Sequence, residues 1–257
     1  MKRPLKRRQN DQQNFLRVVQ NDVEARSSGP QRRKHFSAMD MYDIEPKTDN
    51  QALAFEYVDA LPDCGVLLEG VPGCGKTFLA IYLSLKLILD KSTPYKKLVI
   101  VRSTAQSRDI GFLKGTEEEK IAIFKKPYVA IFDEIFKFKK SFENMEEEGL
   151  VEFESTSFLR GTTFNDSIVI FDEFQNCTGP EALTVLQRIG AFSKIIIAGD
   201  TKQSDLQKAN DQKGNMDFLR VVKAMPSMDV ITFKPEDIVR SGFVRELVET
   251  QIKLGLY

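Results

Sequence analysis

Residues 70–77 carry the pattern Gly-x-x-x-x-Gly-Lys-Thr, which places two glycines and a Lys-Thr pair at a fixed spacing. The short apolar run Val66-Leu67-Leu68 precedes the pattern, and residues 76–89 are apolar on nearly all sides, as in a helix buried in a core. A strand, a glycine-rich loop and a helix in this order form a phosphate-binding loop (P-loop), in which the amino terminus of the helix faces an anion. This segment limits the possible folds of the chain to α/β architectures.

The residue types of the loop suit a nucleoside triphosphate bound with Mg²⁺. Glycines let backbone N–H groups turn toward one anion, Lys76 is placed to reach the β and γ phosphates, and Thr77 offers a hydroxyl to the metal. We therefore predict ATP as the ligand and Mg²⁺ as the cofactor. The nucleotide-binding residues predicted in this segment are Gly70, Val71, Pro72, Gly73, Cys74, Gly75, Lys76, Thr77 and Phe78.

Further apolar runs predict strands, with helix-like segments between them. The predicted strands are residues 65–69, 97–101, 167–171, 194–198 and 228–233, and the clearest later helices are residues 179–189 and 235–254. Strands that alternate with helices predict a parallel sheet covered on both faces. The predicted fold class is α/β, a RecA-like P-loop NTPase and three-layer sandwich with a mostly parallel central sheet. Residues 103–160 show no clean series of strands, and we expect a largely helical excursion there.

The charges divide the chain in two. Residues 1–35 hold ten Lys or Arg and three Asp or Glu, whereas the remainder is acidic by the same margin, because the formal net charge is zero. We assign residues 1–44 to a basic, partly disordered N-terminal arm and residues 45–257 to the P-loop ATPase domain. Such an arm can bind RNA or DNA phosphates, but a solvated tail that pairs with the acidic body explains the charge equally well.

The cysteines and the histidine argue against several other chemistries. Cys64, Cys74 and Cys177 are odd in number and lack metal-ligand spacing, so we expect neither a disulfide framework nor a zinc site. His35 is the one histidine, which makes histidine-based catalysis unexpected. Apolar stretches fall short of the roughly 20 residues of a membrane-spanning helix, and no signal-peptide core follows the basic N-terminus. We expect no membrane partner and a cytoplasmic location, in the host cytoplasm if the chain is phage-encoded.

An acidic pair follows the apolar run at residues 167–171. Asp172, at the end of such a strand, is the expected second anchor for Mg²⁺ beside Thr77 and would hold the metal through a water ligand. Glu173 is then placed to polarise the attacking water, the role that separates hydrolysis from kinase-type transfer. Asp133-Glu134 has a similar form, but the apolar residues around it suit one face of a helix, and we reject it.

Three further polar residues are candidates for contact with the transferring phosphate. Gln203 follows the strand predicted at residues 194–198, and a parallel sheet presents such ends on the phosphate side, so Gln203 is a candidate γ-phosphate sensor. Arg188 and Arg240 are candidates for stabilising the charge of the transition state. The alternatives are an ordinary turn for Gln203 and surface salt bridges for the two arginines.

In combination these segments resemble the PhoH-like ATPases, whose ATP-binding core is similar to that of superfamily one helicases. The resemblance extends from about residue 46 to residue 256. Beyond the P-loop it rests on segments that occur in the same order. They are Val101-Arg102-Ser103, Ile110-Gly111-Phe112-Leu113-Lys114-Gly115, Pro127-Tyr128, Phe158-Leu159-Arg160-Gly161-Thr162, Asp172-Glu173-Phe174-Gln175-Asn176, Arg188-Ile189-Gly190, Gly199-Asp200 with Gln203, and Asp237-Ile238-Val239-Arg240.

Some positions depart from the family pattern, which usually has Ala at Phe174, a Thr-Arg-Pro type segment at residues 101–103 and His at Ser241. The short single-core form with a basic arm resembles bacterial or phage members. The resemblance also implies roles for individual residues: adenine recognition by Gln51, phosphate contacts from Lys76, metal binding by Thr77 and Asp172, coupling by Gln175 and Gln203, and an arginine finger at Arg240.

Two functions remain open at this level. The first is a nucleic-acid-stimulated ATPase, RNA-remodelling or helicase-like, with single-stranded RNA or DNA as its partner. A monomeric translocase closes two cores around ATP and this chain has room for one, so such a motor is expected to be a homo-oligomer, a ring or hexamer, in which Arg240 approaches the neighbouring subunit's nucleotide. The second is a non-motor, ATP-dependent switch or assembly factor that acts on a protein partner.

Overall fold

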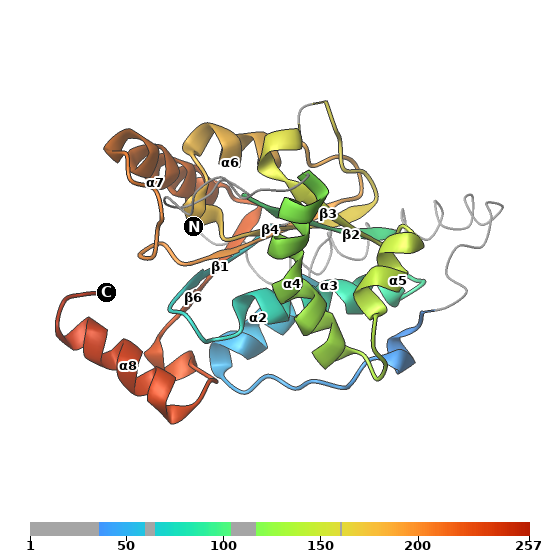
Figure 1. Cartoon of the computed structure of the whole chain (residues 1–257), viewed down its shortest axis with the longest axis horizontal. Helices are drawn as coiled ribbons and strands as arrows, with labels where there is room; N and C mark the ends of the chain where they lie inside the picture. Colours follow the sequence, from blue (N-terminus) through green and yellow to red (C-terminus); the bar gives the residue numbers. More distant parts are fainter. Residues whose placement is uncertain (1–35, 60–64, 104–116, 160) are drawn as a thin grey trace.

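Figure 1 shows the computed structural model, which describes residues 36–59, 65–103, 117–159 and 161–257. Within these ranges six strands form one sheet in the order β3-β2-β4-β5-β1-β6, and every neighbouring pair is parallel. The predicted α/β fold with a parallel central sheet is confirmed. The strands are β1 (Gly65–Gly70), β2 (Lys97–Arg102), β3 (Val151–Ser155), β4 (Ser167–Asp172), β5 (Lys194–Gly199) and β6 (Met228–Phe233).

Helices cover both faces of the sheet, because successive strand residues point to opposite faces. Val66 and Leu68 pack into the core cluster around α3 (Lys76–Leu89), whereas Leu67 packs into the cluster formed with α6 (Gly179–Leu186) and α7 (Ala209–Ala224). Figure 1 shows α6 and α7 on one side of the sheet and α2 (Asp49–Asp59) and α3 on the other. The first face carries α2, α3, α4 (Glu117–Ile135) and α5 (Ser141–Glu147), the second carries α6 and α7, and α8 (Gly242–Lys253) packs beside the P-loop.

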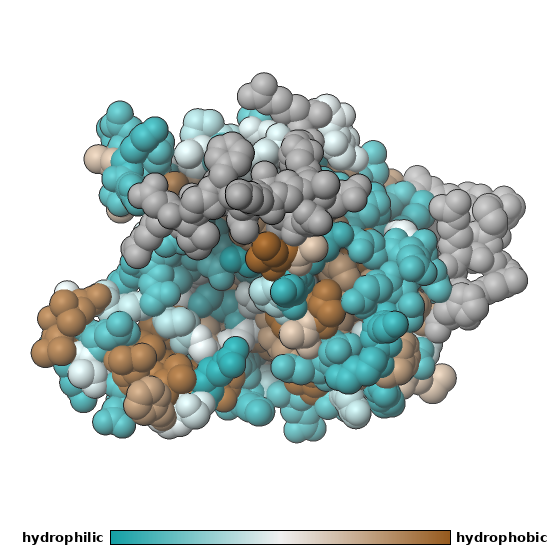
Figure 2. Space-filling view, viewed as in Figure 1, coloured by the Kyte–Doolittle hydropathy of each residue, from teal (hydrophilic) through white to brown (hydrophobic). Residues whose placement is uncertain are grey.

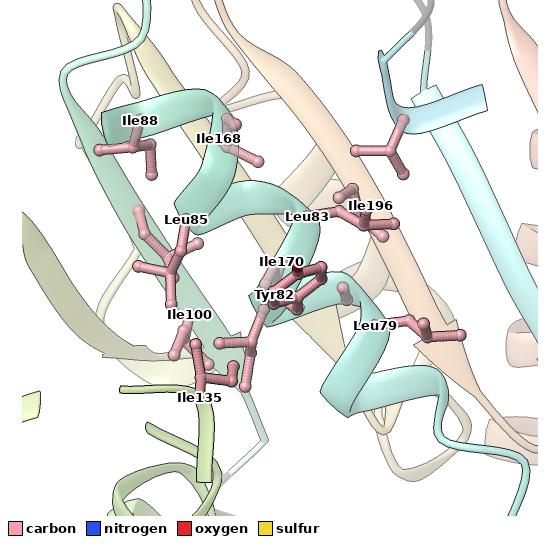
Figure 3. Packing of buried hydrophobic residues seen from close by; sticks show 14 of the residues in the cluster. Leu79, Tyr82, Leu83, Leu85, Ile88, Ile100, Ile135, Ile168, Ile170 and Ile196 are labelled. Atoms are coloured by element: carbon pink, nitrogen blue, oxygen red, sulfur yellow. The ribbon is translucent and has the colours of Figure 1, made fainter. Parts of the chain in front are cut away.

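Helix α3 is buried and carries the P-loop at its amino end. Its apolar side chains pack against isoleucines of β2, β4 and β5, as Figure 3 shows for Leu85, Ile100 and Ile170. Truncating one such side chain to alanine typically costs about 2–5 kcal/mol. This packing fixes the position of the first residues of the helix, Lys76 and Thr77, relative to the ends of the strands.

Strand β3 lies inside the segment for which we predicted a helical excursion. The helical part of that prediction is correct for α4 and α5, and α4 contains the rejected Asp133-Glu134 pair. Residues 151–155, however, pair with β2 at the edge of the sheet, so the expectation that the whole segment leaves the sheet was wrong. Glu152 and Glu154 have low strand propensity, and they obscured the two-residue period of an edge strand.

The helix predicted over residues 235–254 is interrupted. It consists of a short 3-10 turn (Pro235–Asp237), an extended stretch, and α8, which begins after Ser241. In the extended stretch the N–H of Val239 donates to the carbonyl oxygen of Gly73 at 3.1 Å. The interruption therefore brings residues 238–240 onto the P-loop. Helix α7 was not among the named predictions, because the Asn, Asp and Gly residues of its first half are weak helix formers.

Residues 36–44, which we assigned to the arm, contain core side chains. Phe36 and Met41 are buried, and the Phe36 ring meets that of Phe136 edge to face, with 5.8 Å between centroids. Met41 also forms an isolated antiparallel bridge with Phe136. The rest of the predicted arm, residues 1–35, lies outside the described residues. None of the described helices has the length and apolar character needed to cross a bilayer.

Candidate nucleotide-binding site

The P-loop follows β1 and adopts a backbone that requires glycine. Gly70, Gly73 and Gly75 have φ angles of 128°, 82° and 82°. A Cβ atom at Gly70 would lie 2.1 Å from the carbonyl oxygen of Phe233, so a larger residue does not fit there. Helix α3 then begins at Lys76, and the first N–H groups of a helix, which lack partners within it, are the groups that bind an anion in such loops.

Lys76 contacts the loop that precedes it. Its Nζ atom donates hydrogen bonds to the carbonyl oxygens of Gly70 and Val71, both at 2.8 Å, and lies 3.7 Å from Sγ of Cys74. The S–H group of Cys74 donates to the Val71 carbonyl oxygen at 2.9 Å. The ammonium group is therefore held against the first two residues of the loop.

Thr77 and Asp172 meet beside the P-loop although 95 positions separate them, and Thr77 Oγ1 donates to Asp172 Oδ1 at 3.0 Å. Strand β5 lies between β1 and β4, and because all three strands are parallel, the loop and the acidic pair lie at the same edge of the sheet. Asp172 is 3% exposed, and its other oxygen, Oδ2, accepts from the hydroxyl of Tyr128 at 2.9 Å. The structure thus brings together the two residues predicted to hold the metal.

The oxygens at this position suit Mg²⁺. The Thr77 hydroxyl and the Asp172 carboxylate are hard ligands, and Mg²⁺ is commonly bound through one or two carboxylates together with substrate phosphates and water. Within the described ranges no group of three or more His, Cys, Asp or Glu side chains is placed to hold a metal by itself. The pair therefore fits an ion that is bound jointly with a nucleotide rather than a metal held by protein ligands alone.

The ionisation of Asp172 is opposed by its surroundings. Burial and the charge of Glu173 raise the pKa of Asp172 to about 6, although hydrogen bonds from Tyr128 and Thr77 act in the opposite direction. Because the folded state then binds this proton more tightly than the unfolded state, stability falls as pH rises from about 4 to about 6. Metal binding needs the ionised carboxylate, so we expect the affinity for Mg²⁺ to weaken progressively as pH falls below about 6.

Asp172→Asn removes the buried charge and keeps the shape of the side chain. We expect this variant to unfold at a higher temperature than the wild type at pH 7.5, because a neutral amide is less costly to bury than a carboxylate. We also expect it to lose the Mg²⁺ dependence of nucleotide binding. Thermal unfolding with and without Mg²⁺ and ATP measures both effects. A less stable variant that still responds to Mg²⁺ would contradict the assignment of Asp172.

Glu173 and Gln175 form a second polar contact at this edge. Glu173 has a left-handed backbone, with φ at 52°, a conformation that is costly for residues with a Cβ atom. Gln175 Nε2 donates to Glu173 Oε2 at 2.5 Å, and Gln175 Oε1 accepts from the N–H of Asp200 at 3.1 Å. A Cβ atom at Gly199 would lie 2.2 Å from that Oε1, so glycine leaves room for the bridge. The coupling residue implied by the resemblance therefore connects the acidic pair to the end of β5.

Gln51 is buried in α2 and braces the P-loop. Its Nε2 donates to the carbonyl oxygen of Cys74 at 3.0 Å, and its Oε1 accepts from the N–H of Lys47 at 2.8 Å. The side chain thus links the segment before α2 to the loop. Adenine recognition by Gln51 stays a prediction, and it would use the second N–H or the second lone pair of the amide.

The three remaining candidate residues, Gln203, Arg240 and Arg188, lie in different parts of the structure. Gln203 is exposed in the loop after β5, at the P-loop edge. Arg240 is exposed, and a Cβ atom at Gly73 of the same chain would lie 3.2 Å from its Cγ. Arg188 follows α6, and its carbonyl oxygen accepts from the N–H of Phe164, just before β4 begins, at the opposite edge. The backbone of Arg188 thus lies near the edge where the strands start, because α6 returns toward that edge, and a contact of Arg188 with a nucleotide stays a prediction.

Sequence reasoning gave no role to three residues near the site. Tyr128 and Arg102 both interact electrostatically with Asp172. Pro127-Tyr128 is one of the segments shared with the PhoH-like ATPases, but no function was assigned to it from the sequence. The hydroxyl of Tyr257 donates to Asp200 Oδ2, and Nζ of Lys202 lies 5.2 Å from the centroid of the Tyr257 ring. The contact of Tyr257 has no sequence signal, because it depends on how the chain returns after α8.

A P-loop, a hydroxyl and carboxylate pair beside it, and a parallel sheet covered on both faces together define the class of P-loop nucleotide-binding proteins. A family model described as "PhoH-like protein" matches residues 43–251, which is most of the chain. The chain belongs to this family, as the order of its motifs implied.

Relatives of the family occur in several bacteria. A PhoH-like protein of Mycobacterium leprae is 30% identical over 210 residues, which are 80% of this chain and 58% of that protein. A PhoH-like protein of Bacillus subtilis is 31% identical over 201 residues, 77% of this chain and 61% of that protein. The chain thus spans about three-fifths of the length of these relatives. Among solved structures, the match to the Pyrococcus furiosus Hef helicase domain covers 73% of this chain and 38% of the chain in that structure. The two are 12% identical and superpose with a TM-score of 0.41.

Proposed function

We propose that this protein hydrolyses ATP to ADP and phosphate with Mg²⁺. The observation that carries the proposal is the contact between Thr77 and Asp172 beside the P-loop, with Glu173 next in the chain. A loop that binds phosphates, two oxygens suited to Mg²⁺ and a nearby carboxylate are the parts that hydrolysis of a triphosphate requires. The choice of ATP among the triphosphates follows the motifs shared with the PhoH-like ATPases.

Each residue has a distinct task in this proposal. Lys76 and the N–H groups at the start of α3 bind the phosphates and orient them for attack. Thr77 and Asp172 would hold Mg²⁺, which neutralises charge on the phosphate oxygens when it is bound. Glu173 accepts the proton of the attacking water, and the amide of Gln175 fixes the carboxylate of Glu173. Because Glu173 activates a water molecule, the phosphoryl group is transferred to water and not to a second substrate.

We further propose that the protein acts as a homo-oligomer, a ring or hexamer. Phe243 and Leu247 of helix α8 and Leu254, the residue after it, face solvent, with exposed fractions of 75%, 49% and 67%. Figure 2 shows apolar side chains gathered over this part of the molecule. Contiguous exposed apolar surface favours contact with another protein. Because Arg240 lies just before α8, a subunit packed there would be close to the nucleotide site.

We also propose that hydrolysis is linked to single-stranded nucleic acid, with RNA as the first candidate. The support is the division of charge, because residues 1–35 are strongly basic and the remainder is acidic. A basic arm binds phosphate backbones in a salt-dependent manner.

ATP turnover by the full chain, alone and with single-stranded RNA or DNA at low and high salt, tests the proposed function. We expect turnover above the background set by Glu173→Gln, and stimulation by RNA that weakens as salt rises. Turnover without stimulation by either polymer would favour the non-motor switch that acts on a protein partner. Absence of turnover under all conditions would contradict the assignment as an ATPase.

A further inference from the structure

Helix α4 contributes a buried hydroxyl to the metal-binding carboxylate. Tyr128 is fully buried, and its hydroxyl donates to Asp172 Oδ2 at 2.9 Å. The other oxygen, Oδ1, accepts from Thr77, itself a proposed metal ligand. Mg²⁺ would compete with the hydrogen bond between Thr77 and Oδ1 of Asp172. The hydrogen bond from Tyr128 uses the other oxygen, Oδ2, and can persist when the metal is bound.

The position of Tyr128 is determined by packing on several strands. Its ring packs against Phe153 of β3, with 5.6 Å between centroids. Phe124, one turn earlier on the same helix, lies 5.8 Å from the guanidinium of Arg102 at the end of β2. Arg102 is also the partner of Asp172 in the register of β2 and β4. One face of α4 thus packs against β3 and the end of β2, next to the end of β4 that carries the acidic pair, and this packing restricts the Tyr128 hydroxyl.

We propose that Tyr128 is a positioning residue for the metal ligand Asp172, whose carboxylate it holds so that Oδ1 stays presented to Thr77 and Mg²⁺. The inference rests on the proposed function. The terminal torsion of an aspartate is broad and roughly two-fold, so a carboxylate without such a partner samples several orientations. Hydrogen bonds that orient a metal ligand from behind contribute strongly to affinity, and their removal typically weakens metal binding by about 10–100-fold.

Tyr128→Phe removes the hydroxyl and keeps the ring. The readout is binding of a fluorescent ADP analogue at increasing Mg²⁺ concentration, which requires no turnover. We expect the Mg²⁺ concentration at half-maximal binding to rise about tenfold or more. Binding of the analogue in EDTA should not change, because the P-loop contacts of the phosphates are intact.

Tyr82→Phe is the matched control. Tyr82 is 1% exposed and its hydroxyl accepts a hydrogen bond from the N–H of Ile44 at 3.0 Å, so this variant also loses one hydrogen bond of a buried tyrosine. Its Mg²⁺ dependence should match that of the wild type. Thermal unfolding of both variants separates a general loss of stability from a change at the metal site.

Equal Mg²⁺ dependence in the wild type, Tyr128→Phe and Tyr82→Phe would overturn the proposal. If Tyr128→Phe is recovered unfolded, Tyr128→Leu supplies the second test, since it fills an apolar site and has no donor. A Mg²⁺ concentration at half-maximal binding equal to that of the wild type in the folded leucine variant overturns the proposal, and a raised concentration supports it. Failure of the wild type to bind the analogue at any Mg²⁺ concentration would instead overturn the proposed function.

Discussion

Glu173→Gln is expected to lower the rate of ATP hydrolysis by about 10²–10⁴-fold, the usual contribution of a general base. The amide keeps the shape of the side chain and its oxygen can still accept from Gln175, but it cannot take a proton from water. The contact between Thr77 and Asp172 is not altered by the change. The loss should therefore appear in kcat, and binding of ATP with Mg²⁺ should stay close to that of the wild type.

Glu181→Gln is a suitable control for this experiment. Glu181 caps α6 by accepting hydrogen bonds from the N–H and the hydroxyl of Thr178, at 2.9 and 2.8 Å, and has no proposed role at the site. Its replacement should affect stability slightly and turnover hardly at all. Phosphate release and nucleotide binding are measured for all three proteins. Wild-type turnover by Glu173→Gln would show that another group accepts the proton.

Arg240→Ala is expected to lower the rate of hydrolysis by about 10³–10⁵-fold, the range observed where an arginine stabilises the transferring phosphoryl group. Its stem lies beside Gly73 of its own chain and the residue is exposed, so a neighbouring subunit can approach it, and we propose that the guanidinium stabilises charge at that subunit's nucleotide. Nucleotide affinity should change little. Arg220→Ala is the control, because Arg220 is an exposed arginine of α7 paired with Asp217. If Arg240→Ala binds and hydrolyses ATP as the wild type does, the assignment is wrong.

Mixing two inactive variants identifies the site that Arg240 serves. In an oligomer assembled from Arg240→Ala and Glu173→Gln chains, an intact Arg240 of one chain can face an intact Glu173 of its neighbour. We expect part of the activity to return on mixing, because we propose that Arg240 acts on the nucleotide of the adjacent subunit. Two slow variants whose mixture stays slow would place Arg240 at the nucleotide of its own chain.

The central features of the site could be predicted from sequence because each is a continuous segment. The P-loop pattern at residues 70–77 specifies its own backbone, and an apolar run followed by Asp172-Glu173 specifies a strand end. In a parallel sheet the ends of all strands lie at one edge, so the proximity of Thr77 and Asp172 follows from two local patterns.

The features that were missed depend on contacts between distant segments. No local pattern reveals that Tyr128 of α4 reaches Asp172, because the contact requires α4 to pack beside β3 and the end of β4. The interruption at Ile238 to Ser241, which determines the position of Arg240, results from pairing with the P-loop and not from a helix-breaking residue. The backbone position of Arg188 could have been predicted from topology alone, because a helix that follows a strand end returns toward the opposite edge of the sheet.

The bridge formed by Gln175 extends beyond the acidic pair. Glu173 contacts Gln175, Gln175 contacts the backbone of Asp200, and the Asp200 carboxylate accepts from the hydroxyl of Tyr257, which packs with Val71 and with Val248 of α8. These contacts form an unbroken mechanical linkage from the residue that would activate water to the helix with the exposed apolar side chains. If the protein forms the oligomer that we propose, the residue that would activate water and the surface that would meet a neighbour are joined by three side-chain hydrogen bonds and one apolar contact.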